Sequence, residues 1–222
     1  MASLRTKSHP GWVEAALDEY ASFDDFWAEL ESVRGSGSVH ACVVTGHGFR
    51  DPGEEVTLDQ ARRFERFELP AIFAFDGALE GSALRLALAC DIRICGANAS
   101  FRVPLGSRRA LALIGAEASA DLLARRGRVG APAALACGIV SRVGADEAEA
   151  LRDARALASV IASRGPVAVR LAKEAIWRGL ELPFEHALRF ETDLTLLLQT
   201  TKDRAEGVRA FVEKREPNFT GE

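Results

Sequence analysis

Apolar residues in the N-terminal part of the chain first form a short run and then recur at helical spacing. Residues 12–17 alternate loosely between apolar and polar side chains and predict a short strand. Beyond Ser22, apolar residues return at helical spacing from Phe23 to Val33, and two aspartates lie in the first turn. Serine is a preferred residue before a helix, so we expect an amphipathic helix that begins here.

A second unit of strand, loop and helix follows. Glycine and serine fill residues 35–38 and break the first helix. Residues 40–45 carry no acidic or basic residue other than one histidine and predict a strand buried in a parallel sheet. Residues 46–56 predict a loop. The next helix opens at residues 57–60 and must end before Pro70, because the residue before a proline avoids the helical conformation.

The alternation continues in the next stretch of the chain. Residues 71–75 predict a buried strand, residues 76–82 a turn, residues 83–90 a helix and residues 92–95 another strand. Such alternation favours right-handed β-α-β crossovers, and so an α/β fold. From residue 116 onward the pattern predicts helices almost throughout.

A long apolar stripe marks the segment 183–215, with charged residues on its other side. The positions along the stripe are Phe184, Leu188, Glu191, Leu194 or Thr195, and Leu198. A stripe of this kind can belong to the core or to an interface. We favour the core.

Composition narrows the functional classes. The chain has 222 residues, of which 48% are hydrophobic, enough for one substantial core. Its formal charge of -4 comes from acidic and basic residues spread along the chain. Because no long block of one sign occurs, nucleic acid is not an expected partner.

The cysteines and histidines form no recognisable metal-binding or disulfide pattern. Four cysteines lack both a C-x-x-C pair and a zinc-ligand spacing, so we expect reduced thiols and no metal. Residues 2–10 are polar, and no apolar run is long enough to span a membrane. The sequence therefore predicts a cytoplasmic protein without a membrane segment.

Several blocks of the sequence are similar to the motifs of one protein family. Residues 69–77, LPAIFAFDG, are similar to a strand of the Lys-Pro-Val-Ile-Ala-Ala-Val-Asn-Gly type, and residues 86–94, LALACDIRI, to a helix that ends in Ala-Cys-Asp and the strand after it. Further blocks at residues 133–143, 166–175 and 201–219 are similar to later segments of the same family, in the same order. By these blocks the chain resembles the crotonase superfamily, which includes enoyl-CoA hydratases and isomerases.

The resemblance runs from residue 39 to the end of the chain and implies a fold. It predicts an α/β protein with a crotonase-like ββα spiral core in residues 1–165. A C-terminal helical trimerisation region follows in residues 166–222, as part of the same structural unit. The first 38 residues match poorly, and the usual N-terminal hairpin is expected to be shortened.

The resemblance also implies an oxyanion hole, in which two backbone N–H groups stabilise the enolate-like charge of a CoA thioester. The family's second donor matches Ser82, which follows Gly81 in place of a run of glycines. The first donor belongs to a loop of the Phe-Cys-Ala-Gly-Ala-Asp type. Here Pro52 takes that position if Gly53 matches the motif glycine, and proline has no N–H to donate.

Hydratases of this family use two glutamates as the general acid and base. By resemblance, the first glutamate position holds Arg85 and the second holds Leu105. Arginine stays protonated and leucine cannot titrate, so neither replaces a glutamate. Arg85 facing a carboxylate would form a buried ion pair, which we favour. The alternative is that it binds a carboxylate or phosphate of the substrate.

Other polar residues near the implied site leave alternatives open. Glu54 and Glu80, with Asp51 and Glu55, lie in loops expected to face the acyl group. Any of them could be a relocated acid or base, although exposed loop carboxylates are usually solvated. The pair at residues 108–109, both arginines, is either solvated or an anion site.

Phe211 and Lys214 resemble family residues that reach the CoA of a neighbouring subunit, with the ring against adenine and the ammonium near a phosphate. Their alternative is an apolar anchor and a solvated lysine. The resemblance implies a homo-oligomer, a trimer or hexamer, with CoA present only as part of the substrate and no separate cofactor.

Three functions remain compatible with these residues. The chain could be a crotonase-class enzyme with altered or relocated acid/base residues. It could be a non-catalytic acyl-CoA binder or partner subunit, or a pseudoenzyme that has lost CoA as well. Fold alone does not choose among them, because the site decides the reaction. We expect acyl-CoA binding with weak or absent hydratase activity.

Overall fold

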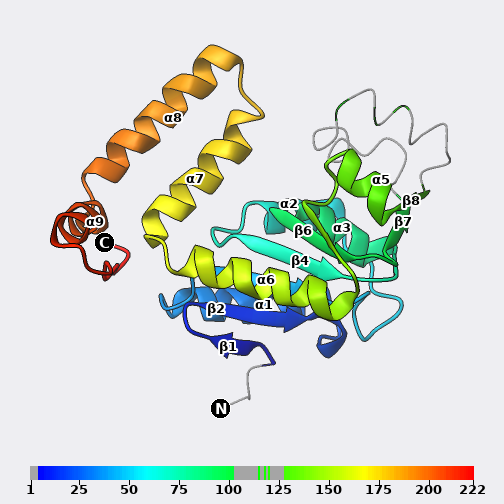
Figure 1. The fold of residues 1–222 in the computed structure, drawn as a ribbon. Coiled ribbons are helices and arrows are strands. Elements are labelled where there is room, and N and C mark those ends of the chain that lie inside the picture. Colours follow the sequence, from blue (N-terminus) through cyan, green and yellow to red (C-terminus); the bar gives the residue numbers. More distant parts are fainter. Residues whose placement is uncertain (1–4, 103–114, 116–117, 119, 121–127) are drawn as a thin grey trace.

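The computed structural model describes residues 5–102, 115, 118, 120 and 128–222, and its centre is a twisted sheet (Figure 1). The six-stranded sheet has the order β1-β2-β3-β4-β6-β9. Its strands are β1 Lys7–His9, β2 Trp12–Ala16, β3 Ala41–Thr45, β4 Ala71–Phe75, β6 Ile92–Gly96 and β9 Arg142–Gly144. β1 pairs antiparallel with β2 and the other neighbours are parallel. The α/β expectation is confirmed.

A second sheet has the order β5-β7-β8. It contains β5 Ala78–Leu79, β7 Ser100–Arg102 and β8 Arg128–Gly130. The expectation of helices almost throughout after residue 116 is wrong for β8 and β9. Each has only three residues, too few to show a period of two, and each forms through pairing with a strand distant in the chain.

Helices cover both faces of the larger sheet. The helices before β9 are α1 Phe23–Gly35, α2 Leu58–Glu65, α3 Gly81–Ala89 and α5 Ala131–Ala136, with a 3-10 turn at Leu17–Glu19. After β9 come α6 Glu147–Ala162, α7 Pro166–Gly179, α8 Phe184–Gln199 and α9 Lys202–Glu213. The Ser22 hydroxyl caps α1 as expected by accepting from the Asp25 N–H, and the Thr57 hydroxyl caps α2 by accepting from the Gln60 N–H.

Successive residues of the strands face two separate cores, as the pleat requires. On one side, Val43, Ile72 and Ile94 pack with the small residues Ala154 and Ala158 of α6. Alanines at one-turn spacing let this helix lie close to the sheet. On the other side, the strands face α1, α2 and α3.

Aromatic side chains fill much of the core on the side of α1. The ring of Phe26 lies 5.7 Å from that of Phe64, and the ring of Trp27 lies 5.3 Å from that of Phe67. Edge and tilted contacts of this kind add to the burial of large apolar area. They fix α1 against α2, and α2 in turn contacts α3.

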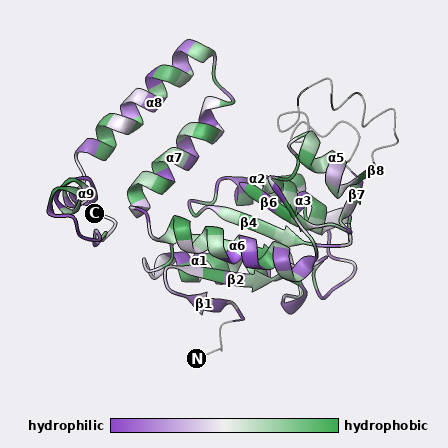
Figure 2. Cartoon of the chain, viewed as in Figure 1, coloured by the Kyte–Doolittle hydropathy of each residue, from purple (hydrophilic) through white to green (hydrophobic). Residues whose placement is uncertain are grey.

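α7 and α8 form a helical hairpin that projects from the body of the molecule (Figure 1). Apolar residues continue along both helices there (Figure 2). In this chain Phe184 is 74% exposed and Leu188 is also exposed, whereas Leu194 is buried. Our preference for the core is therefore wrong at Phe184 and Leu188. The reason is that the hairpin leaves the sheet, so this side of α8 has no partner within the described chain.

Candidate functional site

The first turn of α3 follows directly from the sheet. β4 ends at Phe75, and Gly77 and Gly81 have φ angles of 75° and 56°, which a residue with a Cβ atom rarely adopts. These two glycines turn the chain so that α3 begins at the carboxyl end of β4. No acidic residue lies in its first turn, and the side chain of Glu80 does not cap it.

The Ser82 N–H lies in this first turn, where an α-helix has no internal acceptor to offer. Within the described part of the chain, no hydrogen bond uses this N–H. The helix end also carries partial positive charge. The Ser82 N–H is therefore a backbone donor at the positive end of α3 that has no acceptor among the described residues.

The Ser82 hydroxyl holds the preceding loop against α3. It accepts from Val56 N–H at 2.8 Å and donates to the Glu54 carbonyl at 2.8 Å. The loop of residues 46–56, predicted to contain the first oxyanion donor, is thus fixed next to the second.

Within that loop, the backbone donors around Pro52 are already engaged. Gly53 N–H donates to the Asp51 carboxylate at 2.8 Å, and Glu54 N–H donates to the Asp51 carbonyl at 3.1 Å. Pro52, which is exposed, has no N–H at all. At this turn the loop therefore offers no free N–H at Pro52, Gly53 or Glu54.

Arg85 lies one turn after Ser82 and is half-buried. Its Nη1 donates to the Val56 carbonyl, so Ser82 and Arg85 together hold both polar backbone groups of Val56. The expectation that Arg85 forms an ion pair is wrong, because among the described residues no carboxylate contacts it. In the loop, the Glu54 carboxylate accepts from a backbone N–H of α1.

Glu54 accepts from the Phe23 N–H at 2.9 Å, at the positive end of α1. This contact gives the carboxylate a structural role. Glu80 and Glu55 are exposed. Leu105 and the arginine pair at 108–109 lie outside the described residues.

Comparison with known proteins decides the family. Residues 49–222 match the family model described as enoyl-CoA hydratase/isomerase. The chain belongs to this family. The match covers the loop around Pro52, the first turn of α3 and the whole C-terminal helical region.

Named relatives agree with the family assignment. The chain is 31% identical over 219 residues to the 2,3-dehydroadipyl-CoA hydratase of Escherichia coli K12, covering 87% of this chain and 86% of the relative. It is 36% identical over 167 residues to a probable mitochondrial enoyl-CoA hydratase 2 of Arabidopsis thaliana, covering 71% of this chain. That match spans only 55% of the Arabidopsis protein.

A solved structure extends the likeness to the fold. The enoyl-CoA hydratase of Bacillus anthracis superposes with a TM-score of 0.76 at 28% identity, covering 98% of each chain. The crotonase-like fold predicted from the sequence blocks is therefore confirmed. β1 and β2 form the hairpin at the N-terminus.

Phe211 and Lys214, the residues matched to the enoyl-CoA hydratase family's CoA contact, lie at the end of α9. Phe211 is 85% exposed and Lys214 is also exposed. Lys214 ends the helix in the left-handed conformation with φ 54°. Both side chains therefore point away from the core of their own chain.

Sequence reasoning missed the role of Asp91 within the Ala-Cys-Asp block. Its carboxylate accepts from Ala71 N–H at 2.7 Å, from Lys173 Nζ at 2.7 Å and from Trp177 Nε1 at 2.5 Å. This network fastens α7 to the start of β4. An acidic residue directly after a buried helix is a signal that could have pointed to Asp91. Its side-chain partners lie 82 and 86 residues away in the sequence, so they could not be predicted.

The cysteines agree with the expectation of reduced, mostly buried thiols. All four are free, and Cys42, Cys90 and Cys95 are buried. Burial raises the pKa of the Cys42 thiol to about 12 and that of Cys95 to about 11. No cluster of metal-binding side chains occurs within the residues that the structure describes. Nor does that part of the chain hold a helix both long and apolar enough to cross a bilayer.

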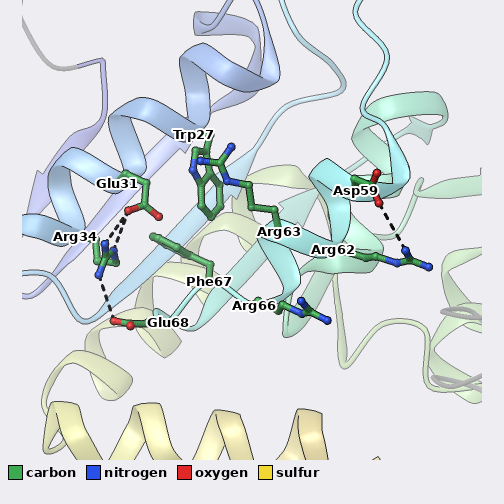
Figure 3. Close-up of a pocket in the computed structure, with 9 residues that line it drawn as sticks. All are labelled: Trp27, Glu31, Arg34, Asp59, Arg62, Arg63, Arg66, Phe67 and Glu68. Carbon is green, nitrogen blue, oxygen red and sulfur yellow. Dashed lines mark hydrogen bonds and ion pairs between the residues drawn. The ribbon is translucent and has the colours of Figure 1, made fainter. Parts of the chain in front are cut away.

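A groove of about 550 Å³ lies between α1 and α2, apart from the first turn of α3 (Figure 3). Three of the four arginines that line it, Arg34, Arg62 and Arg63, have partners among neighbouring side chains. Arg34 contacts Glu31 at 2.8 Å and Glu68 at 3.4 Å, and the Arg63 guanidinium lies 4.5 Å from the centre of the Trp27 ring. None of the residues matched to the family's acyl site lines this groove.

Proposed function

We propose that this enoyl-CoA hydratase/isomerase family member binds an acyl-CoA thioester at the first turn of α3, with weak or absent hydratase turnover. One observation carries the proposal. Ser82 N–H is available as a donor, and Arg85, which the resemblance matches to a catalytic glutamate, is fixed to the Val56 carbonyl. Relatives named as hydratases of CoA thioesters support the class of ligand.

Stabilisation of the oxyanion is expected to be incomplete. Pro52 cannot donate, and both N–H groups that follow it are bound to Asp51. Removal of one oxyanion donor typically lowers a rate by roughly 100- to 1,000-fold. A thioester carbonyl at Ser82 would therefore bind with little stabilisation of the transition state.

Proton transfer is expected to suffer as well. Hydration needs a base to activate water and an acid to protonate the α-carbon, and each such group contributes roughly 100- to 10,000-fold. Neither Arg85 nor Leu105 has a carboxylate that could accept and return a proton. Enzymatic turnover would then require a relocated acid or base, for which Glu80 and Glu54 are the candidates. The alternative to such turnover, which we prefer, is a non-catalytic acyl-CoA-binding or partner subunit.

We further propose that a neighbouring subunit completes the CoA-binding site. The exposure of Phe211 and Lys214 supports their use outside their own chain. The exposed apolar residues of α8 support a trimer or hexamer, in which that helix finds a partner. Free thiols at all four cysteines support a cytoplasmic location.

The test compares crotonyl-CoA hydration by the wild type with that of the double variant Arg85→Glu, Leu105→Glu. We expect turnover near background in the wild type, and a measurable gain in the double variant if the pocket retains its shape. A matched control is Arg62→Glu, an exposed arginine on α2 that pairs with Asp59. Hydration by the wild type at rates typical of enzymes would refute the proposal.

A further inference from the structure

Arg85 places a positive charge beside the proposed oxyanion donor, and binding of a thioester carbonyl does not require that charge. Resting on the proposed function, we propose that the acyl group selected by this site carries its own carboxylate, and that Arg85 recognises it. The substrate class is then a short dicarboxylic acyl-CoA.

Arg85 shares a face of α3 with the proposed oxyanion donor. Residues three apart on a helix have Cβ atoms roughly 5–6 Å apart. Ser82 and Arg85 are separated by three positions, and both contact Val56. A ligand whose carbonyl meets Ser82 N–H therefore has its next few carbon atoms near Arg85.

The guanidinium has donors to spare. It carries five N–H groups, and the structure uses one of its nitrogens, Nη1, for the Val56 carbonyl. That bond orients the side chain without neutralising its charge. Among the described residues no carboxylate contacts Arg85, and the Glu54 carboxylate is bound to Phe23 N–H instead.

The helix end adds charge of the same sign. The first turn of α3 contains no acidic residue, and no side chain caps it. Its partial positive charge and the half-buried Arg85 cation therefore act within one turn of each other. A thioester carbonyl is neutral in the ground state, so it does not balance the positive charge of Arg85. A carboxylate on the acyl chain would pair with the guanidinium fork through two parallel hydrogen bonds.

Calorimetric titration of the full chain with free CoA, butyryl-CoA and succinyl-CoA tests the inference. We expect succinyl-CoA to bind about tenfold or more tightly than butyryl-CoA, the usual effect of a charge-assisted hydrogen bond. Arg85→Gln should abolish this difference, and Arg85→Lys should restore part of it. The control Arg62→Gln removes one exposed arginine and should leave the preference intact.

The outcomes separate the two proposals. Equal affinity of the wild type for succinyl-CoA and butyryl-CoA overturns this inference and leaves the proposed function standing. A loss in Arg85→Gln that is equal for all three ligands means that Arg85 contacts a phosphate of CoA, which also overturns it. If the wild type binds none of the three, the proposed function fails, and this inference with it. The wild-type comparison is informative even if a variant does not fold.

Discussion

At the scale of single residues, long-range polar contacts fix the fold. Glu14 on β2 is buried, and its carboxylate accepts from Arg155 of α6 at 2.7 and 3.0 Å. Lys7 lies 3.6 Å from the same carboxylate. Burial alone would raise the pKa of Glu14, but the hydrogen bonds and charge of Arg155, with the charge of Lys7, lower it below its usual value.

This lowered pKa makes a prediction about acid stability. A carboxylate with a depressed pKa stabilises the fold above its unfolded-state pKa, and the contribution is lost as pH falls through the folded-state value. Glu14→Gln should lower the free energy of unfolding by about 1–3 kcal/mol at neutral pH. The difference from wild type should shrink below about pH 4.5. Urea unfolding across pH checks this, and a difference independent of pH would contradict it.

Residue chemistry could be read from the sequence only where it is local. The caps at Ser22 and Thr57 act on residues three positions away, so their roles were predictable. The partner of Arg85 was not. We expected an ion pair, but Arg85 donates to the Val56 carbonyl instead. The Glu54 carboxylate accepts from a backbone N–H at the start of α1.

At the scale of elements, the C-terminal tail holds α9 in place. The buried Asp203 carboxylate accepts from Thr220 N–H at 2.7 Å and Gly221 N–H at 3.0 Å. The ring of Phe219 packs against two glycines, Gly165 and Gly207. A Cβ atom added at Gly165 would lie 3.7 Å from the ring, and one added at Gly207 would lie 3.6 Å from it. The tail thereby connects α9 to the start of α7.

If Phe211 and Lys214 contact CoA, the tail should position them. Phe219→Ala removes the packing that orients α9, so we expect CoA affinity to fall severalfold while the main thermal transition changes little. Asn218→Ala is the control, because the described contact of that exposed residue uses its backbone N–H. Calorimetric titration with CoA measures the effect. An unchanged CoA affinity in Phe219→Ala would contradict the proposal that the tail positions these residues.

At the scale of the whole molecule, the strand and helix order was predictable, whereas the placement of the C-terminal helices was not. Buried runs and caps indicate the α/β body, since they reflect local packing. The apolar stripe of α8 gives the same signal for a core or an interface. Only the projection of the hairpin from the sheet distinguishes them, and it leaves Leu188 46% exposed.

That exposure predicts dependence of the assembly on α8. Leu188→Glu, at an exposed position of the stripe, should convert a trimer or hexamer into smaller species, because a charge in an apolar interface loses its hydration. His186→Glu, at an exposed polar position on the opposite side of the same helix, is the matched control. Sedimentation velocity distinguishes the species. A wild type that sediments as a monomer would contradict the proposed assembly.

The central claim is binding of an acyl-CoA with little or no hydration. Calorimetric titration of the wild-type protein with crotonyl-CoA tests both parts in one measurement. We predict heats that saturate with added ligand and return to the baseline after every injection, as binding without turnover requires. Sustained heat after each injection would indicate hydration, and the absence of any binding heat would indicate that the site does not bind the thioester; either result would contradict the account.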